Sequence, residues 1–409
     1  MSDERILTAA LVLTGPADEV IEDGAVRVRD GVFADVGPRR EVVERAAPDT
    51  PVLDLGGATL LPGLIDCHVH LAFDASEDPV AALRAADDRD LLLDMAGRAR
   101  RLLDAGVTTA RDLGDRGGLA ARLRDAIEAG TLPGPRLLTA GPPITVTGGH
   151  CWFLGGAADG ADRIRERVRR NVADGADVIK VMSTGGSMTA GGPPAWQAQF
   201  SVEEVTLVVT EAARFGRRVA AHAHGTAGIE VALAAGVHTL EHCSFVTEPA
   251  LGEDHERQDR LIREIAERGV AVCPTFSATL TDVERRLGPD VLRPWLNLVH
   301  RQYEAGVRLI AGTDAGIAQA PFEGYAQGLE WYVRAGLPPR AVLEMATTNA
   351  AEALGLAERI GRIAIGLDAD AVVVDDDPRK GFGTLADPRL VLRRGRPHVP
   401  APRASAEAA

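Results

Sequence analysis

Residues 60–70 read Leu60-Leu61-Pro62-Gly63-Leu64-Ile65-Asp66-Cys67-His68-Val69-His70, an apolar run that ends in two histidines two positions apart. Side chains alternate between the two faces of a β-strand, so the imidazoles of His68 and His70 point to the same side. Two imidazoles on one face at the end of a strand can bind one metal ion. Two surface histidines after a strand would show the same spacing, and the rest of the chain decides between these interpretations.

Length and charge limit the classes of protein that the chain can belong to. It has 409 residues, 45% of them hydrophobic, and a formal net charge of −14. This length suits one large α/β barrel with a small accessory domain, or about two to three ordinary domains. The acidic balance argues against nucleic acid and against an anionic membrane surface as partners.

The sequence predicts a cytoplasmic protein. The first residues are charged and no apolar secretory core follows them. The longest uncharged run, 137–158, is interrupted by Gly, Pro, Thr and His150, so we expect no membrane helix there. The four cysteines are widely spaced without a CxxC motif, which favours reduced thiols. They are Cys67, Cys151, Cys243 and Cys273.

Short apolar runs at the two ends of the chain predict one small β domain. Near the start, Asp30-Gly31 lies between two such runs and is a hairpin signal. Neither end has enough apolar surface for a core of its own, so we predict that residues 1–61 and 360–403 pair into a small β-sandwich. The Pro- and Ala-rich end of the chain, from about 397 and in any case 404–409, is expected to be disordered.

Between the two ends, helical stretches repeatedly end in a glycine that an apolar run follows at once. Glycine suits the left-handed position just past a helix. A repeated helix-to-strand junction predicts βα units and a parallel sheet. The junction glycines are Gly106, Gly175, Gly216, Gly236, Gly269 and Gly306.

We count eight predicted strands, which favours a (βα)8 TIM-like barrel over residues 62–359. Helices are expected between them, for example over 79–104, 201–215 and 259–268. An open doubly wound sheet is the alternative, but it would need a glycine-rich loop where Asp66-Cys67-His68-Val69-His70 stands. The strands are predicted at 64–70, 107–112, 136–140, 177–182, 218–224, 237–243, 270–275 and 307–313.

Candidate ligands gather at the carboxyl ends of these strands, where (βα)8 barrels have their active sites. Imidazole and carboxylate both bind Zn²⁺ and similar ions. Five ligands exceed the needs of one tetrahedral ion and suggest two metals. These ligands are His68, His70, His222 or its neighbour His224, His242 and Asp314, and His150 follows the third strand.

Lys180, in the fourth predicted strand, is unusual for this chain. Lysine and arginine total 45, but Lys180 and Lys380 are the only lysines. A neutral lysine amine can add carbon dioxide to form a carbamate that bridges two metals, whereas an arginine guanidinium cannot. We therefore expect a carboxylated lysine, with a buried lysine paired to an acid as the alternative.

These motifs together resemble the amidohydrolase superfamily, in particular imidazolonepropionases, metal-dependent Xaa-Pro dipeptidases/carboxypeptidases and ochratoxin-hydrolysing amidases. The resemblance covers nearly the whole chain, including the tail 366–370, and is more specific for the superfamily than for a substrate. The motifs lie at 62–70, 147–150, 178–182, 219–225, 240–242 and 311–316.

The resemblance implies a role for each ligand. His68, His70 and Asp314 would bind the first metal, most simply Zn²⁺, and His222 and His242 the second, with carboxylated Lys180 bridging both. A bridging hydroxide would attack an amide carbonyl, and Asp314 would move the proton to the leaving nitrogen.

His222 and His224 share one strand face, so alternation alone leaves either as the ligand. The resemblance favours His222, which makes His224 and His150 candidate catalytic residues that hydrogen-bond the carbonyl or the substrate. Candidate substrate contacts are Arg111, Trp152 and Tyr325.

The resemblance favours a binuclear hydrolase of an N-acyl amino acid, a dipeptide or a similar small-molecule amide. It also implies that the protein forms a homo-oligomer. A cyclic amide hydrolase for imidazolones or lactams and a mononuclear deaminase are the alternatives. Deaminases of the superfamily usually carry a glutamate three residues after the strand-five histidine, where this chain has Gly225. A non-catalytic relative is disfavoured because all ligands are present.

Overall fold

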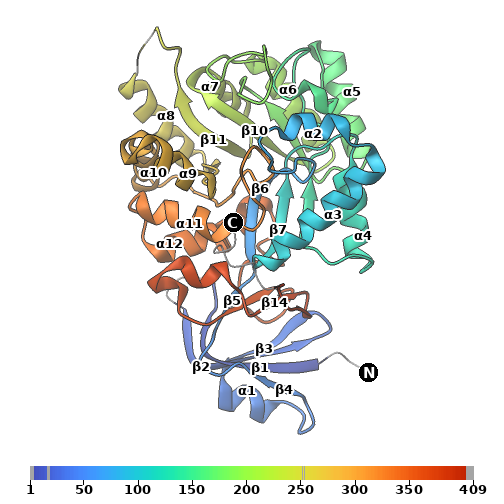
Figure 1. Ribbon diagram of the computed structural model, residues 1–409, viewed down its shortest axis with the longest axis vertical. Helices are drawn as coiled ribbons and strands as arrows, with labels where there is room; N and C mark the ends of the chain where they lie inside the picture. Colours follow the sequence, from blue (N-terminus) through green and yellow to red (C-terminus); the bar gives the residue numbers. More distant parts are fainter. Residues whose placement is uncertain (1–3, 16–18, 251, 253, 402–409) are drawn as a thin grey trace.

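The computed structural model describes residues 4–15, 19–250, 252 and 254–401 (Figure 1). The predicted disordered tail 404–409 lies outside these residues. Within them the strands near the two ends of the chain form one sheet, which we call the end sheet. The strands of the middle form two other sheets. Figure 1 shows the end sheet below the middle of the chain.

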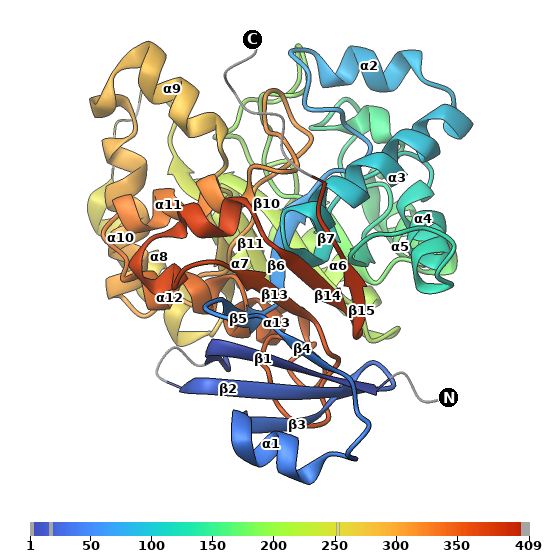
Figure 2. The same ribbon diagram turned by 60° about the horizontal axis from the view of Figure 1, so that its bottom comes forward.

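The end sheet contains strands from both ends of the chain, as predicted. Leu61 of β5 pairs with Val372 of β13, so the two ends join in antiparallel register (Figure 2). The strands form one sheet in the order β15-β14-β13-β5-β1-β2-β3, with β4 beside β1, and the predicted sandwich of two sheets is not confirmed. The strands are β1 Glu4–Leu13, β2 Val20–Arg29, β3 Val32–Pro38, β4 Val52–Asp54, β5 Thr59–Pro62, β13 Ala371–Val374, β14 Leu390–Arg393 and β15 Arg396–His398.

Local sequence explains the turns of this sheet. Arg29 pairs with Val32, and both Asp30 and Gly31 between them have positive φ, 52° and 84°. This is the two-residue turn that Asp-Gly favours. At the other end of the sheet β15 pairs with β14, so the expectation that disorder begins at about residue 397 is wrong for residues 397 and 398.

The strands of the middle are all parallel where they pair. They form a sheet β6-β7-β8 and a sheet β12-β11-β10-β9. The junction glycines have positive φ between 65° and 99°, which confirms the predicted helix-to-strand punctuation. The strands are β6 Leu64–Val69, β7 Val107–Asp112, β8 Arg136–Thr139, β9 Val178–Met182, β10 Arg218–Gly225, β11 Thr239–Val246 and β12 Ala271–Cys273.

The predicted eighth strand, 307–313, is not a regular strand. Leu309 makes an isolated parallel bridge to Val272, and Ala315 makes another to Val69. The amide and the hydroxyl of Thr313 donate to the carboxylate of Asp66 instead of continuing a ladder. The middle is therefore a TIM-barrel-like α/β arrangement of two parallel sheets joined by bridges, and the structure does not show one continuous closed barrel.

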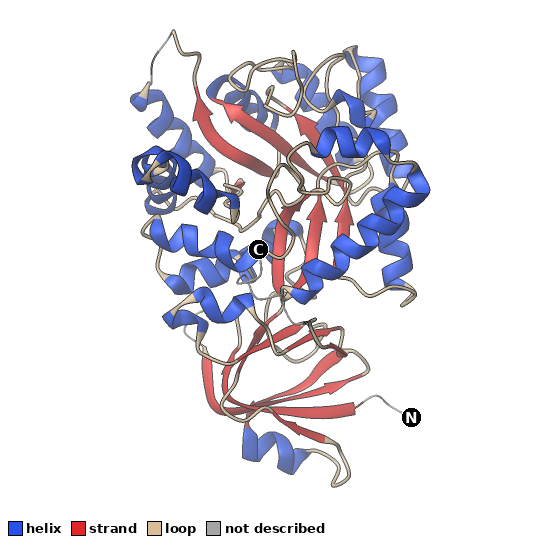
Figure 3. Ribbon diagram, in the orientation of Figure 1, coloured by secondary structure: helices blue, strands red, loops and turns tan. Residues whose placement is uncertain are grey.

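Helices flank these sheets (Figure 3). The predicted helix 79–104 is two helices, because Asp87 accepts from the amides of Arg89 and Asp90 and so begins the second one. The helices of the middle are α2 Pro79–Ala85, α3 Asp88–Asp104, α4 Leu119–Glu128, α5 Gly160–Ala173, α6 Val202–Ala213, α7 Thr226–Ala235, α8 His255–Glu267, α9 Thr279–Leu287, α10 Arg293–Glu304, α11 Tyr325–Arg334, α12 Pro339–Met345 and α13 Thr348–Leu354. Helix α1, Arg39–Arg45, lies against the end sheet.

One buried ion-pair cluster joins the end sheet to the middle of the chain. Arg136, at the start of β8, donates to Asp370 at 2.6 Å and to Asp368 at 2.7 Å. All three residues are buried. The tail segment that precedes β13 is thus held by charge as well as by strand pairing.

Two further expectations concern the whole chain. All four cysteines are buried, and none is paired in a disulfide in this structure. Among the residues that the structure describes, no helix is both long enough and apolar enough to cross a bilayer.

Candidate metal centre

The structure brings the predicted ligands together at the carboxyl ends of the parallel strands. His68 lies in β6 and His70 directly after it, whereas Lys180 comes from β9. His222 and His224 come from β10, His242 from β11, and Asp314 from the segment that replaces the eighth strand. Positions far apart in the sequence thus meet in one place, as the barrel prediction required.

The first cluster contains His68, His70 and Asp314. Nε2 of His68 lies 3.2 Å from Nε2 of His70, and Oδ1 of Asp314 lies 3.4 Å and 3.3 Å from these two nitrogens. Ligand atoms around a tetrahedral Zn²⁺ with bonds of about 2.0–2.1 Å are roughly 3.3 Å apart. This spacing fits three ligands of one metal ion.

Hydrogen bonds on the far side of each ring leave these nitrogens free for a metal. Nδ1 of His70 lies 3.1 Å from the carbonyl oxygen of Gly114, and Nδ1 of His68 lies 2.9 Å from Oε2 of Glu241. A carbonyl and a carboxylate only accept, so both rings carry their proton on Nδ1 and a lone pair on Nε2. Metal-binding histidines usually have such a partner.

Glu241 is a residue whose role the sequence reasoning missed. Its Oε1 accepts from the guanidinium of Arg111 at 2.8 Å, and both side chains are almost fully buried. Arg111 also donates to the carbonyl oxygen of Cys67 and to Thr239. Its nitrogens are therefore occupied inside the fold, and its contacts give no support to the prediction that it binds substrate. The only sequence signal for Glu241 was a carboxylate directly before His242.

Asp66 holds the first cluster together through the backbone. Its carboxylate accepts from the amide of His68 at 3.1 Å and from the amide and hydroxyl of Thr313 at 3.1 and 2.6 Å. The segment that presents Asp314 is thereby tied to the strand that presents His68. Asp314 itself has φ 58°, a left-handed conformation of the kind that is often found at functional sites.

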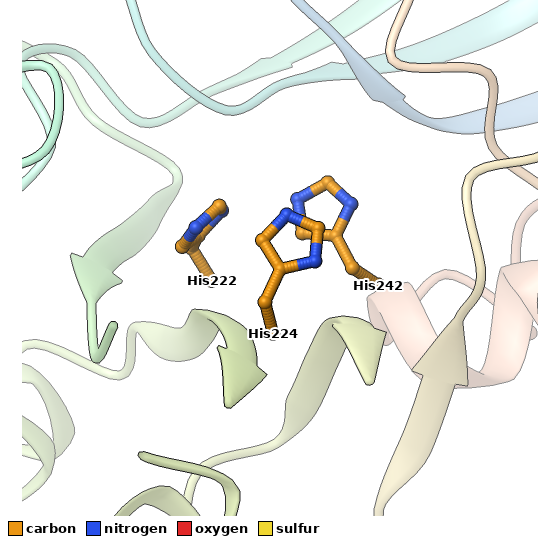
Figure 4. A group of neighbouring side chains, drawn as sticks. All are labelled: His222, His224 and His242. Atoms are coloured by element: carbon orange, nitrogen blue, oxygen red, sulfur yellow. The ribbon is translucent and has the colours of Figure 1, made fainter. Parts of the chain in front are cut away.

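The second cluster contains His222, His224 and His242, whose ligand atoms lie within 4.8 Å of one another (Figure 4). The three imidazoles face a common space beyond the ends of β10 and β11 (Figure 4). The ring centroid of His242 is 4.7 Å from that of His222 and 4.3 Å from that of His224. Proximity alone therefore does not decide which neighbour of His242 is the ligand.

Hydrogen bonds distinguish the two candidates. Nε2 of His222 donates to the carbonyl oxygen of Gly185 at 3.1 Å, which leaves a lone pair on Nδ1. Nδ1 of His224 meets the hydroxyl of Ser244 at 2.7 Å, and a hydroxyl can donate or accept. Only His222 is thus fixed in a tautomer that presents a free nitrogen, which favours it as the ligand.

His242 is fixed in the same way. The hydroxyl of Thr275 donates to the carbonyl oxygen of Pro274 at 2.7 Å, so at 2.8 Å it accepts from Nδ1 of His242. The lone pair of His242 then lies on Nε2. Like Asp314, His242 has a left-handed backbone, with φ 69°.

Lys180 is 1% exposed, and its Nζ has no hydrogen-bond partner within the described part of the chain. Burial lowers its pKa to about 8, so a substantial fraction of the amine is neutral near physiological pH. Among the described residues no acid forms a close pair with Lys180, which was the alternative weighed above. The amine of Lys180 is buried, has no partner among the described residues and lies beside several candidate metal ligands. These properties suit an amine that is covalently modified or bound to a metal ion.

The remaining candidates differ in position. The ring centroid of His150 lies 4.6 Å from that of His222, and its buried Nδ1 has no partner among the residues described. Trp152 is 45% exposed on the short helix η1, Trp152–Leu154. Tyr325 is buried, and its hydroxyl donates to the carbonyl oxygen of Ile65 at 2.6 Å. His150 thus belongs to the site, while substrate contacts by Trp152 and Tyr325 stay predictions.

The residues present fit divalent metal. Imidazole nitrogens and a carboxylate oxygen are ligands that Zn²⁺ and similar ions prefer. Oδ1 of Asp314 is buried without a hydrogen-bond partner in the described structure, an arrangement that costs free energy unless a cation compensates it. The histidine and aspartate clusters are thus suited to a metal centre.

Residues 59–399 match the amidohydrolase family. The chain belongs to this family and is a hydrolase that acts on carbon–nitrogen bonds. The match spans every ligand described above and most of the C-terminal half of the end sheet. It confirms the resemblance inferred from the motifs.

Several relatives are similar over nearly the whole chain. The ochratoxinase of Aspergillus niger is 30% identical over 94% of this chain and 84% of its own. The imidazolonepropionase of Symbiobacterium thermophilum is 26% identical over 92% of this chain and 90% of its own. The crystal structure of a Xaa-Pro dipeptidase with methionine bound in its active site has a TM-score of 0.83 at 28% identity, covering 97% of this chain and 100% of the other.

Proposed function

We propose that the protein is a binuclear metal-dependent amidohydrolase that cleaves the amide bond of an N-acyl amino acid, a dipeptide or a similar small amide. The observation that carries the proposal is the spacing of 3.2–3.4 Å among the ligand atoms of His68, His70 and Asp314, beside a second histidine cluster. The similarity to a Xaa-Pro dipeptidase and to an ochratoxinase supports a linear amide.

His68, His70 and Asp314 would hold the first ion, and His222 and His242 the second, with Lys180 as a carbamate between them. The unpaired Nζ of Lys180 and the fixed tautomers of the histidines support this assignment. Two divalent ions, most simply Zn²⁺, would supply Lewis-acid polarisation of the amide carbonyl and an activated water.

The chain's own side chains have the remaining tasks. The carboxylate of Asp314 takes a proton from the attacking water and returns it to the leaving nitrogen. His150 and His224 flank His222, with centroid distances of 4.6 and 4.7 Å, so both can donate to the substrate carbonyl. We also infer a complete (βα)8 barrel around this site, supported by the bridges of Leu309 and Ala315 to strands on either side.

A deaminase is disfavoured by Gly225. A Cβ atom at this position would lie 2.5 Å from the carbonyl oxygen of Trp196, so the glutamate of the deaminases does not fit without moving that loop. A cyclic amide hydrolase is the second candidate, because the similarity to an imidazolonepropionase spans 92% of the chain.

Metal analysis combined with a substrate panel tests the proposal. The protein is loaded with Zn²⁺, dialysed and assayed against N-acyl amino acids, dipeptides, lactams, imidazolones and aminated heterocycles. Two ions per chain with hydrolysis of linear amides is the expected result. Ring opening alone would establish the second candidate, and one ion per chain with release of ammonia from an aminated ring would overturn the proposal.

A further inference from the structure

A small cavity of about 100 Å³ opens directly beside the second histidine cluster. His224 and His242 form part of its wall, and apolar side chains from the segment after β12, from α9 and from α10 form most of the rest. These apolar side chains are Phe276, Leu280, Trp295, Leu298 and Val299. The cavity is thus continuous with the place where the substrate carbonyl is expected.

The hydroxyl groups that line this cavity already have hydrogen-bond partners within the protein. The hydroxyl of Ser244 pairs with His224, and that of Thr275 pairs with Pro274 and His242. Of the described residues that line it, none is Asp, Glu, Lys or Arg. A charged group placed there would lose its hydration without gaining a partner, which is costly.

The lining side chains of the cavity differ in exposure, so one end of the cavity is buried and the other is open. Phe276, Leu280, Leu298 and Val299 are each less than one-tenth exposed, whereas Trp295 is 48% exposed. An apolar group entering past Trp295 would cover this ring and contact the four buried side chains. The arrangement resembles a side-chain pocket more than a channel for water.

We propose that this pocket binds a compact apolar substituent of the substrate, such as a branched aliphatic or phenyl side chain next to the scissile amide. The inference rests on the proposed function and narrows its substrate class. Apolar cavities of about 150 Å³ hold one benzene molecule, and this cavity has about two-thirds of that volume and suits a compact group. Burying such a side chain favours binding by about 10- to 100-fold.

The first test compares substrates that differ only in one side chain. N-acetyl derivatives and glycyl or aminoacyl dipeptides of Gly, Leu, Phe, Asp and Lys are assayed with the metal-loaded protein. We expect kcat/KM for Leu or Phe to exceed that for Gly by about 10- to 100-fold, with Asp and Lys below Gly. Equal rates for all side chains, or a preference for a charged one, would overturn the inference.

Filling the pocket is the second test. Leu280→Trp should lower kcat/KM for the Leu and Phe substrates by about 10- to 100-fold more than it lowers kcat/KM for the Gly substrate. Leu287→Trp is the matched control, because Leu287 lies on the same helix, α9, but is 67% exposed and outside the pocket. An equal loss for all substrates in Leu280→Trp would contradict a side-chain pocket. Leu298→Ala, which enlarges the pocket instead, should shift the preference towards Trp side chains.

A binding measurement separates this inference from the proposed function. Calorimetric titration of the metal-free protein with N-acetyl-L-phenylalanine and with N-acetylglycine needs no turnover. Tighter binding of the phenylalanine derivative, lost in Leu280→Trp, supports the pocket even if no amide is hydrolysed. Turnover of many amides without any difference in binding would instead leave the proposed function standing and refute the pocket.

Discussion

Glu241 binds His68 and Arg111 at the same time: Oε2 lies 2.9 Å from Nδ1 of His68, and Oε1 accepts from Arg111 at 2.8 Å. The negative charge therefore fixes the imidazole that would bind the first metal. We predict that Glu241→Gln weakens metal binding about 10- to 100-fold, because the amide cannot replace both charge-assisted hydrogen bonds. Competition with a chromogenic chelator measures this affinity.

The control for this prediction is another buried glutamate outside the site. Glu211 is 3% exposed and pairs with Arg169 and Arg214 on the protein surface. Glu211→Gln should leave metal affinity unchanged. If both variants lose metal to the same extent, a general loss of stability explains the result and the role given to Glu241 is wrong.

Lys180→Ala should lose most of its metal and activity, and added acetate or propionate should restore part of both. In Lys180→Ala a small carboxylate can occupy the place of the carbamate. In Lys180→Arg the guanidinium cannot take the place of the carbamate. Lys380→Ala offers a matched control, since it removes the other lysine of the chain. Lys180→Ala with two ions and full activity would refute the carbamate.

Single substitutions should separate the two histidines of β10. His222→Ala should bind one ion fewer per chain, because Nδ1 of His222 is the nitrogen left free by its hydrogen bond to Gly185. His224→Ala should keep both ions and lose about 100-fold in kcat. Elemental analysis of the dialysed proteins gives the metal content. The reverse pattern would make His224 the ligand.

Arg136→Met should destabilise the protein without changing the site. It leaves the buried carboxylates of Asp368 and Asp370 without their shared partner, which costs about 3–5 kcal/mol of unfolding free energy. The exposed pair of Arg163 with Glu166 supplies the comparison, and Arg163→Met should cost less than about 1 kcal/mol. Urea denaturation of both variants measures the difference.

Tyr325→Phe tests whether the tyrosine binds substrate or supports the fold. Its hydroxyl donates to the carbonyl oxygen of Ile65, so its loss should lower the unfolding free energy by about 1–3 kcal/mol. KM should stay within about twofold of the parent value, since the side chain is buried away from solvent. A large rise in KM with unchanged stability would instead restore the substrate contact that the sequence suggested.

The clustering of the candidate ligands was predictable because strand alternation and the carboxyl-end rule depend only on local sequence. His68, His70, the pair His222 and His224, His242 and Asp314 could be placed at strand ends from their spacing behind apolar runs, whereas the preference for His222 over His224 came from the family resemblance. The hairpin at Asp30-Gly31 and the pairing of the chain ends followed from equally local signals. The irregularity of the eighth strand was not predictable in this way, because it involves the amide of Thr313, which donates to the side chain of Asp66 and not to the backbone of a neighbouring strand.

The supporting contacts were beyond sequence reasoning for a different reason. Arg111 was predicted to contact the substrate because it lies near the carboxyl end of a predicted strand. The direction of its side chain, however, depends on Glu241, which is distant in sequence. The apolar pocket likewise combines residues of α9, of α10 and of the segment after β12 that no local pattern connects. Long-range side-chain contacts of this kind emerge only when the elements are packed.

The pairing of β5 with β13 also means that the end sheet can be completed only late in synthesis. Strands β1 to β5 leave the ribosome first, yet β13 becomes available only after the whole middle has been made. Until then β5 has an open edge, and exposed edge strands invite pairing with other chains. Truncation before β13 should therefore yield insoluble protein even though every metal ligand is present, and slow elongation through the middle should have the same effect.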